Sequence, residues 1–522
     1  MQWENEIPPM PFTQDRVWKV VASAGTGKSY SIEKCIFELI DSGVKPMEIM
    51  YLIYNKVPGH EFKQRMVSRG IDEKELRWVG THHSVCMKML GLGKKSLLNI
   101  KEWGEARNMD FDEEKKGWSE VLKSLEQKIN AEQTDYDPHE AKLLTLLQNE
   151  ESINKQWTHV RYRAHALAME RIPPEVKYVF VDEAQDSVLI QWKYFEFLRG
   201  LEQIQGLMLA GDDKQAVNGW TGGRGDMFLK FQADRQVCLG KTYRNAPAIL
   251  RAANNIAMQI QERSPLTTES AQPFEGEVSE IPYFQNCVPD ILDALKNKKS
   301  IMVLCRAGFV ANGCKDLLVQ NGVPVASDGR TGVLATLKAL DVAANKPLQN
   351  LTFMDIFNIF SSKKLKTKGY WDNYAKFERG EFEDTARAEY ALMCADMPWS
   401  GDLSMFGAKP RLEEDLAAMR EGRIPTEGWS AASEETVLDA FRSMKTYGPD
   451  MIPVRVSTIH KIKGAECDVV VLVKNISGAI RQTERDDPDE ECKIWYTGAT
   501  RAREKLIITE LFADYLQVTR LV

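Results

Sequence analysis

Residues 16–29 read RVWKVVASAGTGKS, and this stretch decides the fold. Its first part, residues 17–22, is an apolar run of strand length, and residues 31–40 repeat apolar side chains at helical spacing. Between the strand and the helix, glycines let backbone N–H groups turn inward around phosphate oxygens, and the helix N-terminus adds its dipole. The stretch therefore predicts a phosphate-binding loop that joins a strand to a helix.

The residues of this loop have different expected roles. Lys28 is expected to reach the β- and γ-phosphates of a nucleotide, and the Ser29 hydroxyl to hold Mg²⁺. The backbone that would cradle the phosphates belongs to Ala24, Gly25, Thr26 and Gly27. The pattern departs from the usual one at its first glycine, which is Ala22 here. For this string alone, a glycine-rich turn without a ligand is the alternative.

A second apolar run, YVFVDEAQD at residues 178–186, ends in two adjacent carboxylates. Asp182 lies where a strand should end, which is the position of the carboxylate that completes the Mg²⁺ shell in phosphate-loop nucleotidases. Glu183 is the candidate to orient or deprotonate the attacking water. A lone Asp-Glu pair is usually a solvated strand end, but the phosphate-binding loop upstream favours catalysis.

A third run, GLMLAGDDKQ at residues 206–215, carries Gln215 just past its end. A side-chain amide at that point could sense the γ-phosphate of a nucleotide. Phosphate-binding loop, Asp-Glu pair and glutamine follow three strands in order. This order predicts a parallel α/β core that hydrolyses ATP.

Further apolar runs predict a second parallel sheet. Residues 300–306, 468–473 and 505–509 each have the length and composition of a buried strand. Residues 316–320 and 323–325 are the expected helix and strand that follow the first of them. None of these runs leads into a second phosphate-binding loop, so a single nucleotide site is expected.

Composition limits the class of protein without deciding it. No apolar run reaches the roughly 18 residues that a membrane span needs, and no signal-peptide pattern begins the chain. The nine cysteines include no C-x-x-C pair, which favours reduced thiols in a cytoplasmic protein. A net charge of −7 argues against a nucleic-acid partner, although a groove can be basic on an acidic protein.

With these residues in place, the chain resembles the UvrD/Rep/PcrA group of superfamily 1 helicases. The strings that carry the resemblance follow the family's order: DEAQD (182–186), AGDDKQAVNGW (210–220), TYRN (242–245), VSTIHKIKGAE (456–466) and WYTGATRAR (495–503). The resemblance implies an α/β fold with two RecA-like parallel-sheet domains, each carrying a mainly helical insertion. It also implies ATP and Mg²⁺ as ligands.

The resemblance also assigns roles to residues downstream of the ATPase core. Tyr243 would stack on adenine, Glu466 would hydrogen-bond the ribose, and Arg244 and Arg501 would contact the γ-phosphate. Arginine suits this task because its planar fork grips phosphate oxygens and keeps its charge. Without the surrounding strings, surface arginines in salt bridges would be the better interpretation.

The expected domain order alternates cores and insertions. Residues 88–172 and 342–450 are the candidate insertions, since both mix helical stretches with several tryptophans. The predicted ranges are 1–87 and 173–250 for the first domain, and 251–341 and 451–522 for the second.

Contacts with nucleic acid are expected from several separate positions. Trp220 would stack on a base, with a core tryptophan as the alternative. The resemblance supplies four further candidates, Thr81, His83, Ser84 and His460. The aromatic of the family's Thr-Phe-Thr-Asn-Lys string is missing here, and Tyr54, at a neighbouring position, is the candidate to replace it. Two more departures from the family concern these contacts and the adenine. An arginine usual after the tryptophan is Thr221, and only Gln14 stands near the place of a glutamine that reads adenine.

The sequence thus predicts an ATP-driven motor on single-stranded DNA that unwinds tailed or forked duplexes, and the resemblance implies 3′-to-5′ movement. A translocase with little unwinding and an ATP-switched scaffold triggered by nucleic acid are the alternatives. RNA is an alternative track, and a separately encoded nuclease or a replication or repair protein is a candidate partner. The expected setting is the cytoplasm, beside the nucleoid, in a bacterial, archaeal or phage system.

Overall fold

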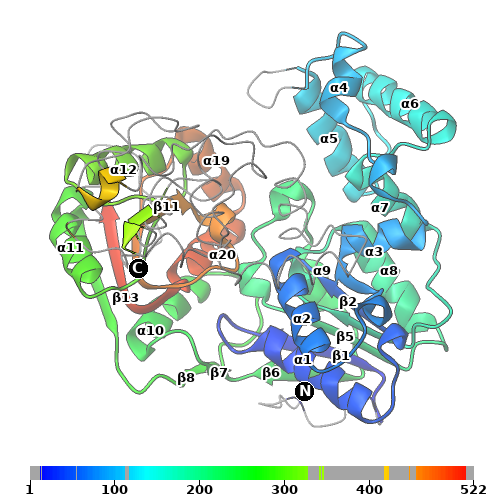
Figure 1. Cartoon of the computed structure of the whole chain (residues 1–522), viewed down its shortest axis with the longest axis horizontal. Helices are drawn as coiled ribbons and strands as arrows, with labels where there is room; N and C mark the ends of the chain where they lie inside the picture. The colour runs from blue at the N-terminus through cyan, green and yellow to red at the C-terminus, as the bar shows by residue number, and fades with distance from the viewer. Residues whose placement is uncertain are drawn as a thin grey trace. The chain divides into compact units, whose positions relative to one another are not determined.

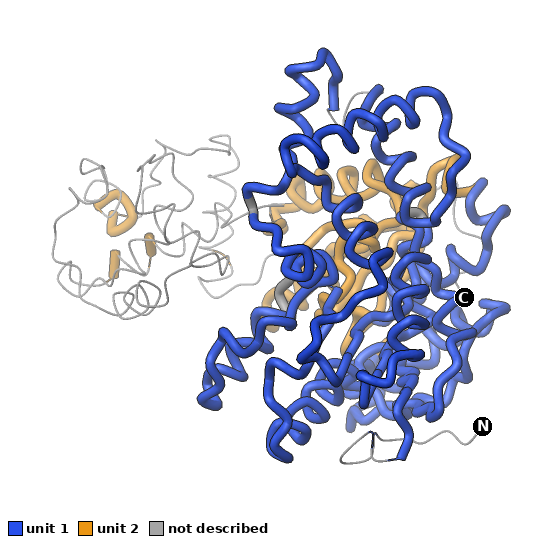
Figure 2. Tube along the Cα trace, turned by 90° about the vertical axis from the view of Figure 1, so that its right-hand side faces the viewer, with its two compact units in different colours: residues 1–276, 482–500, 520–522 blue, residues 277–481, 501–519 orange. Residues whose placement is uncertain are grey.

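The computed structural model describes residues 14–54, 56–111, 117–326 and 454–512, with residues 7, 12, 340–341, 344–345, 417–421 and 446. The chain forms two compact units, which Figure 2 colours separately. Unit 1 comprises residues 1–276, 482–500 and 520–522, and unit 2 comprises residues 277–481 and 501–519. The domain boundary predicted after residue 250 falls inside helix α10 (Pro247–Ala257). This helix packs on α20 (Pro488–Ala499), and both helices belong to unit 1, which continues to residue 276.

Unit 1 contains a six-stranded sheet with the order β3-β2-β4-β5-β1-β6, in which every pair is parallel (Figure 1). Its strands are β1 (Val17–Ala22), β2 (Ile49–Ile53), β3 (Val79–Thr81), β4 (Tyr178–Val181), β5 (Gly206–Gly211) and β6 (Arg235–Leu239). The strands predicted at residues 17–22, 178–181 and 206–211 are confirmed. A short parallel pair, β7 (Lys241–Thr242) with β8 (Glu269–Ser270), completes the strands of this unit.

Strand β1, which lies between β5 and β6, is buried on both faces, as its continuous apolar sequence predicts. Val17 and Val21 point into one core cluster, whereas Trp18 and Val20 point into the other. The helices of the unit's core are α1 (Lys28–Asp41), α2 (Lys56–Ser68), α3 (His82–Met89), α8 (Leu189–Gly200) and α9 (Gly225–Lys230). Because parallel strands end at one edge, the loops after β1, β4 and β5 meet there.

The described part of the predicted first insertion is helical. It holds α4 (Ile100–Glu105), α5 (Trp118–Asn130), α6 (Pro138–Ile153) and α7 (His159–Ala168). Trp103, Leu125 and Leu143 belong to a separate small core in this region. Asp137 caps α6 by accepting from the backbone N–H of Glu140, whose carboxylate accepts in return from the N–H of Asp137.

Unit 2 contains a five-stranded parallel sheet with the order β11-β10-β12-β13-β9. Its strands are β9 (Glu277–Tyr283), β10 (Ile301–Cys305), β11 (Arg455–Thr458), β12 (Cys467–Val473) and β13 (Ala502–Glu510). The further helices are α11 (Val288–Lys296), α12 (Gly308–Gln320) and the first part of α19 (Gly478–Asp486), whose residues 482–486 belong to unit 1. The strands predicted within residues 300–306, 468–473 and 505–509 are confirmed.

Two expectations for unit 2 have other outcomes. The strand predicted at residues 323–325 is reduced to a single bridge between Val325 and Val454. The second insertion, predicted at residues 342–450, lies outside the described residues except for the few named above. Within the described chain, no helix is both long and apolar enough to cross a bilayer.

Candidate nucleotide and nucleic-acid site

The loop after β1 has the backbone that its glycines predict. Gly25 and Gly27 have φ angles of +69° and +76°, in the left-handed region that favours glycine. A Cβ at Gly25 would lie 2.4 Å from the Cβ of Arg244, so a side chain there would collide as well. The hydroxyl of Thr26 donates to the Ser23 carbonyl at 2.9 Å and tightens the turn. The loop leads directly into α1, with Gly27 as its N-cap.

The end of β4 brings both predicted carboxylates to this loop. The Ser29 hydroxyl donates to Asp182 Oδ2 at 2.5 Å, and Lys28 Nζ donates to Glu183 Oε1 at 2.7 Å. Glu183 has a φ of +53°, which is unusual for a residue with a side chain and is found mainly at functional or turn positions. Residues separated by more than 150 positions in sequence therefore converge on one point at the edge of the sheet.

In this cluster the single ammonium of Lys28 faces the two carboxylates of Asp182 and Glu183. Burial by itself would lower the pKa of Lys28, but the carboxylates of Glu183 and Asp182 outweigh it and the pKa is raised. Lys28 therefore stays cationic, as a phosphate ligand must. Burial raises the pKa of Asp182, which is only 4% exposed.

The same cluster fits Mg²⁺ bound together with a nucleotide. Ser29 and Asp182 offer a hydroxyl and a carboxylate oxygen 2.5 Å apart, and Mg²⁺ prefers oxygen ligands. Among the described residues, no group of three or more His, Cys, Asp or Glu side chains could hold a metal ion. A protein site with two oxygen ligands suits Mg²⁺ because this ion usually keeps several waters and phosphate oxygens.

The end of β5 holds Gln215 in a buried polar network. Gln215 lies in the 3₁₀ turn η5 (Asp213–Gln215), and its amide donates to Asp212 Oδ2 at 3.0 Å. Lys214 Nζ lies 3.4 Å from Asp212 and 3.5 Å from Asp213, with none of the three side chains more than 1% exposed. Ser264 accepts from Lys214 at 2.8 Å. This network fixes the turn that presents Gln215.

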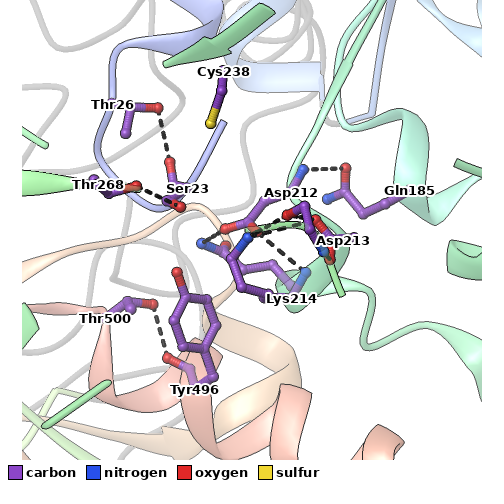
Figure 3. Close-up of polar contacts among 12 residues, drawn as sticks. Ser23, Thr26, Gln185, Asp212, Asp213, Lys214, Cys238, Thr268, Tyr496 and Thr500 are labelled. Carbon is purple, nitrogen blue, oxygen red and sulfur yellow. Dashed lines mark hydrogen bonds and ion pairs between the residues drawn. The ribbon is translucent and has the colours of Figure 1, made fainter. Parts of the chain in front are cut away.

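A second string predicted from the resemblance reaches the loop within unit 1. Tyr496, on α20, is buried beside Ser23 and Lys214, and its burial raises the pKa of its phenol (Figure 3). The amide of Asn245 donates to the Thr500 carbonyl at 3.1 Å, which joins the TYRN string to the end of α20. Lys214 and Tyr496 were not predicted as site residues, because nothing in the sequence shows that they lie side by side.

A pocket of about 660 Å³ opens beside the phosphate-binding loop. Thr26 and Gly27 line one part of it, and two exposed aromatic side chains, Tyr30 and Tyr243, line another. The backbone N–H of Tyr243 donates to the Gly25 carbonyl at 2.8 Å, which ties this tyrosine to the loop. The pocket has room for an adenine and ribose. Tyr30 was missed from sequence because nothing there showed which face of α1 borders the loop.

Three of the predicted residues belong to unit 2. Arg501 is 2% exposed and donates to the Ala465 carbonyl at 3.2 Å. Glu466 pairs with Arg503. His460 lies in the 3₁₀ turn η10 (Ile459–Ile462), where burial, helped by Arg306, lowers its pKa to about 4. The imidazole is therefore neutral at physiological pH.

The predicted nucleic-acid contacts of unit 1 follow the carboxyl ends of its strands. Thr81 ends β3 and caps α3 by accepting from the Ser84 N–H at 3.2 Å. Tyr54 follows β2 and accepts from the Asn218 amide at 2.8 Å. The backbone of Trp220 lies in the turn η6 (Gly219–Thr221), but its side chain lies outside what the structure describes. These positions share one edge of the sheet with Lys28 and Glu183.

Arg163, on α7, connects these positions to the helical segment. It is 7% exposed, donates to Asn130 Oδ1, and lies 3.4 Å from His83 Nε2. Asn130, at the end of α5, donates in turn to the Thr221 carbonyl at 3.2 Å, beside Trp220. Sequence gave no sign of this connection, because its members come from four distant segments.

Comparison with known proteins agrees with this geometry. A phosphate-binding loop, carboxylates at a parallel strand end and a second parallel sheet define the class of ATP-hydrolysing DNA helicases. The model for the UvrD/REP helicase N-terminal domain matches residues 9–159 and 94–236, and that for the UvrD-like helicase C-terminal domain matches residues 453–509. Together the matches cover more than half of the chain, which belongs to the UvrD/Rep helicase family.

Curated relatives carry names of the same kind. A probable DNA helicase II homolog of Mycoplasma capricolum is 20% identical to this chain, and the match covers 97% of this chain and 83% of the relative's length. DNA helicase II of Rickettsia typhi is 26% identical over 64% of this chain and 60% of the relative's length. The ATP-dependent DNA helicase PcrA of Staphylococcus aureus is 24% identical over 47% of this chain, which spans only 38% of PcrA.

Proposed function

We propose that this chain couples ATP hydrolysis to 3′-to-5′ movement along single-stranded DNA and thereby unwinds tailed duplexes. The observation that carries the proposal is the convergence of Lys28 and Ser29 with Glu183 and Asp182. The nucleic-acid candidate Thr81 follows a strand of the same sheet at the same edge. ATP hydrolysis and binding of single-stranded DNA would then be linked through the same β-sheet of unit 1. The direction rests on likeness to the family.

In the proposed hydrolysis, Lys28 binds the β- and γ-phosphates while the loop N–H groups hold their oxygens. Glu183 orients the attacking water and accepts its proton, and Gln215 senses the γ-phosphate. Mg²⁺, held by Ser29 and Asp182, neutralises charge on the phosphate oxygens when it is bound.

The base and sugar would occupy the pocket beside Tyr243. Its exposed ring can stack on adenine, while Arg244, next in sequence, contacts the γ-phosphate. We assign Arg501 a second γ-phosphate contact and Glu466 the ribose, both from the family's pattern. Loss of the γ-phosphate would then change the contacts of both arginines.

Single-stranded DNA would be bound by Tyr54, Thr81, His83 and Ser84 in unit 1, and by His460 in unit 2. Trp220 adds base stacking, worth roughly 1–3 kcal/mol per base. Stacking and backbone contacts read no base sequence, so single-stranded RNA is the alternative track. A nuclease, replication or repair partner supplied by another gene is compatible with this function.

Strand displacement on duplexes with either a 3′ or a 5′ tail tests the direction and the unwinding. The proposal predicts ATP-dependent separation of the 3′-tailed duplex and little of the 5′-tailed one, with Glu183→Gln inactive on both. Preference for the 5′ tail would refute the direction. Removal of streptavidin from a biotinylated single strand, without duplex separation, would establish the translocase alternative.

A further inference from the structure

A second cavity of unit 1 lies at the opposite edge of the sheet from the nucleotide. Its volume is about 360 Å³, and its walls come from Arg77 and Trp78 before β3 and from the segment 171–175 before β4. The last turn of α3, with Lys88, and the end of α7 close it. Because these segments precede the strands, the cavity lies at their amino ends. We refer to it as the amino-edge pocket.

The amino-edge pocket is positively charged. Arg77, Lys88 and Arg171 line it, and among the described residues no carboxylate lies within ion-pair distance of any of them. The one acidic residue of the lining, Glu175, already accepts from the indole N–H of Trp78 at 2.9 Å. A chain with a net charge of −7 thus has a local surplus of cations here.

Two of these cations, Lys88 and Arg77, have contacts that orient them. Lys88 Nζ donates to the Arg77 carbonyl at 2.7 Å, and the guanidinium of Arg77 lies 4.9 Å from the Trp78 ring centroid. Burial, followed by the nearby Lys63 and Arg77, lowers the pKa of Lys88 to about 8. An anion would relieve this repulsion, and side chains that are already ordered lose little entropy on binding it.

The remaining walls of the pocket are aliphatic. Met89 and Leu90 follow Lys88, and Ile172 and Pro173 follow Arg171, so each cation has an apolar neighbour. Trp78 is only 4% exposed, which leaves no aromatic face for a base to stack on. The lining therefore suits a ligand that combines carboxylates with aliphatic side chains, and not a nucleic-acid strand.

We propose that the amino-edge pocket binds an acidic, aliphatic peptide segment of a partner protein. A carboxylate of the peptide would accept charge-assisted hydrogen bonds from Arg77, Lys88 and Arg171, and an aliphatic side chain would pack on Met89 and Ile172. The site is separate from the predicted nucleic-acid contacts, so a partner could bind while the motor holds DNA. The pocket is independent of the proposed direction of movement.

Fluorescence anisotropy of the full chain with a labelled peptide of Asp and Leu residues tests this proposal. The wild type should bind it, and a peptide with Asn in place of each Asp should not bind. Arg77→Glu and Arg171→Glu should each weaken binding by about tenfold or more, since each adds like charge to the contact. The matched control is Lys74→Glu, which changes an exposed lysine close to Arg77 but outside the pocket and should leave affinity unchanged.

The basal ATP hydrolysis of each variant verifies that it is folded, because neither arginine belongs to the nucleotide site. Failure of the wild type to bind the acidic peptide would overturn the proposal. Equal binding of the Asn peptide would overturn the role of charge. Displacement of the peptide by a single-stranded oligonucleotide, with the same loss in Arg77→Glu, would reassign the pocket to nucleic acid.

Discussion

Replacement of Lys214 by methionine should strongly destabilise unit 1. The ammonium is fully buried between Asp212 and Asp213, 3.4 Å and 3.5 Å away. Methionine keeps most of the aliphatic stem, so the change removes the charge with little loss of volume. Two carboxylates then remain buried without their cation.

The magnitude follows from these distances. With an effective dielectric constant of about 20, each ion pair is worth roughly 5 kcal/mol of attraction, much of which offsets desolvation. Removal of one partner of a buried pair costs about 3–5 kcal/mol. Lys230 provides the control, because it pairs with Asp226 at 3.1 Å but is 63% exposed. Lys230→Met should cost at most about 0.5 kcal/mol.

Hydrogen exchange of the β5 amides is the suitable assay, since a chain with two units is not expected to unfold in one step. Lys214→Met should accelerate exchange by roughly 100-fold or more, and Lys230→Met by less than about threefold. Adding Asp212→Asn and Asp213→Asn to Lys214→Met should restore part of the protection. The loss should also shrink in acid, because burial raises the pKa of Asp212 and this carboxylate becomes protonated there.

A loss below about 1 kcal/mol for Lys214→Met would refute this reasoning. A large loss that neither the double Asn change nor acid relieves would also contradict it. In that case packing, and not the buried charges, would hold the turn that carries Gln215.

Gly25→Ala should abolish ATP binding and lower stability, since its Cβ would meet Arg244. Gly43 is the control, because its φ is +101° and a Cβ there would meet no atom, so Gly43→Ala should cost only about 1 kcal/mol in a thermal melt. Tyr243→Ala should raise KM for ATP by about tenfold with little change in kcat, if the ring contributes only to binding of the base; an unchanged KM would contradict that role. Burial raises the pKa of Glu126 to about 7, above the ordinary 4.5, so its ionisation costs stability as the pH rises through this range. Glu126→Gln should therefore be about 1–3 kcal/mol more stable than the wild type between pH 5 and pH 8, measured by hydrogen exchange of the α5 amides, and a pH-independent difference would contradict this.

Much of the core was predictable because its signals are local. The run from Val17 to Ala22 is apolar throughout, which marks a strand buried on both faces, and it begins and ends where predicted. The glycines before Lys28 require the left-handed backbone that the structure contains. Strand ends carrying Asp182 and Gln215 then had to meet the loop, because parallel strands end at one edge.

The features that could not be predicted are those in which residues far apart in the sequence come together. Arg163, Asn130 and Thr221 carry no shared pattern, and only the packing of α5 against α7 and the turn η6 joins them. The amino-edge pocket likewise collects cations from three segments. For the same reason, residues 482–500 were predicted within the second domain, at 451–522, whereas they belong to unit 1, where α20 packs on α10.

Steady-state ATP hydrolysis with and without single-stranded DNA tests the central claim most directly. We expect strong stimulation by DNA in the wild type, and a loss of about 10²- to 10⁴-fold in Glu183→Gln, which keeps the size of the side chain but removes the base. Hydrolysis that responds to neither DNA nor RNA would contradict a nucleic-acid-coupled motor. It would favour an ATP-switched scaffold instead.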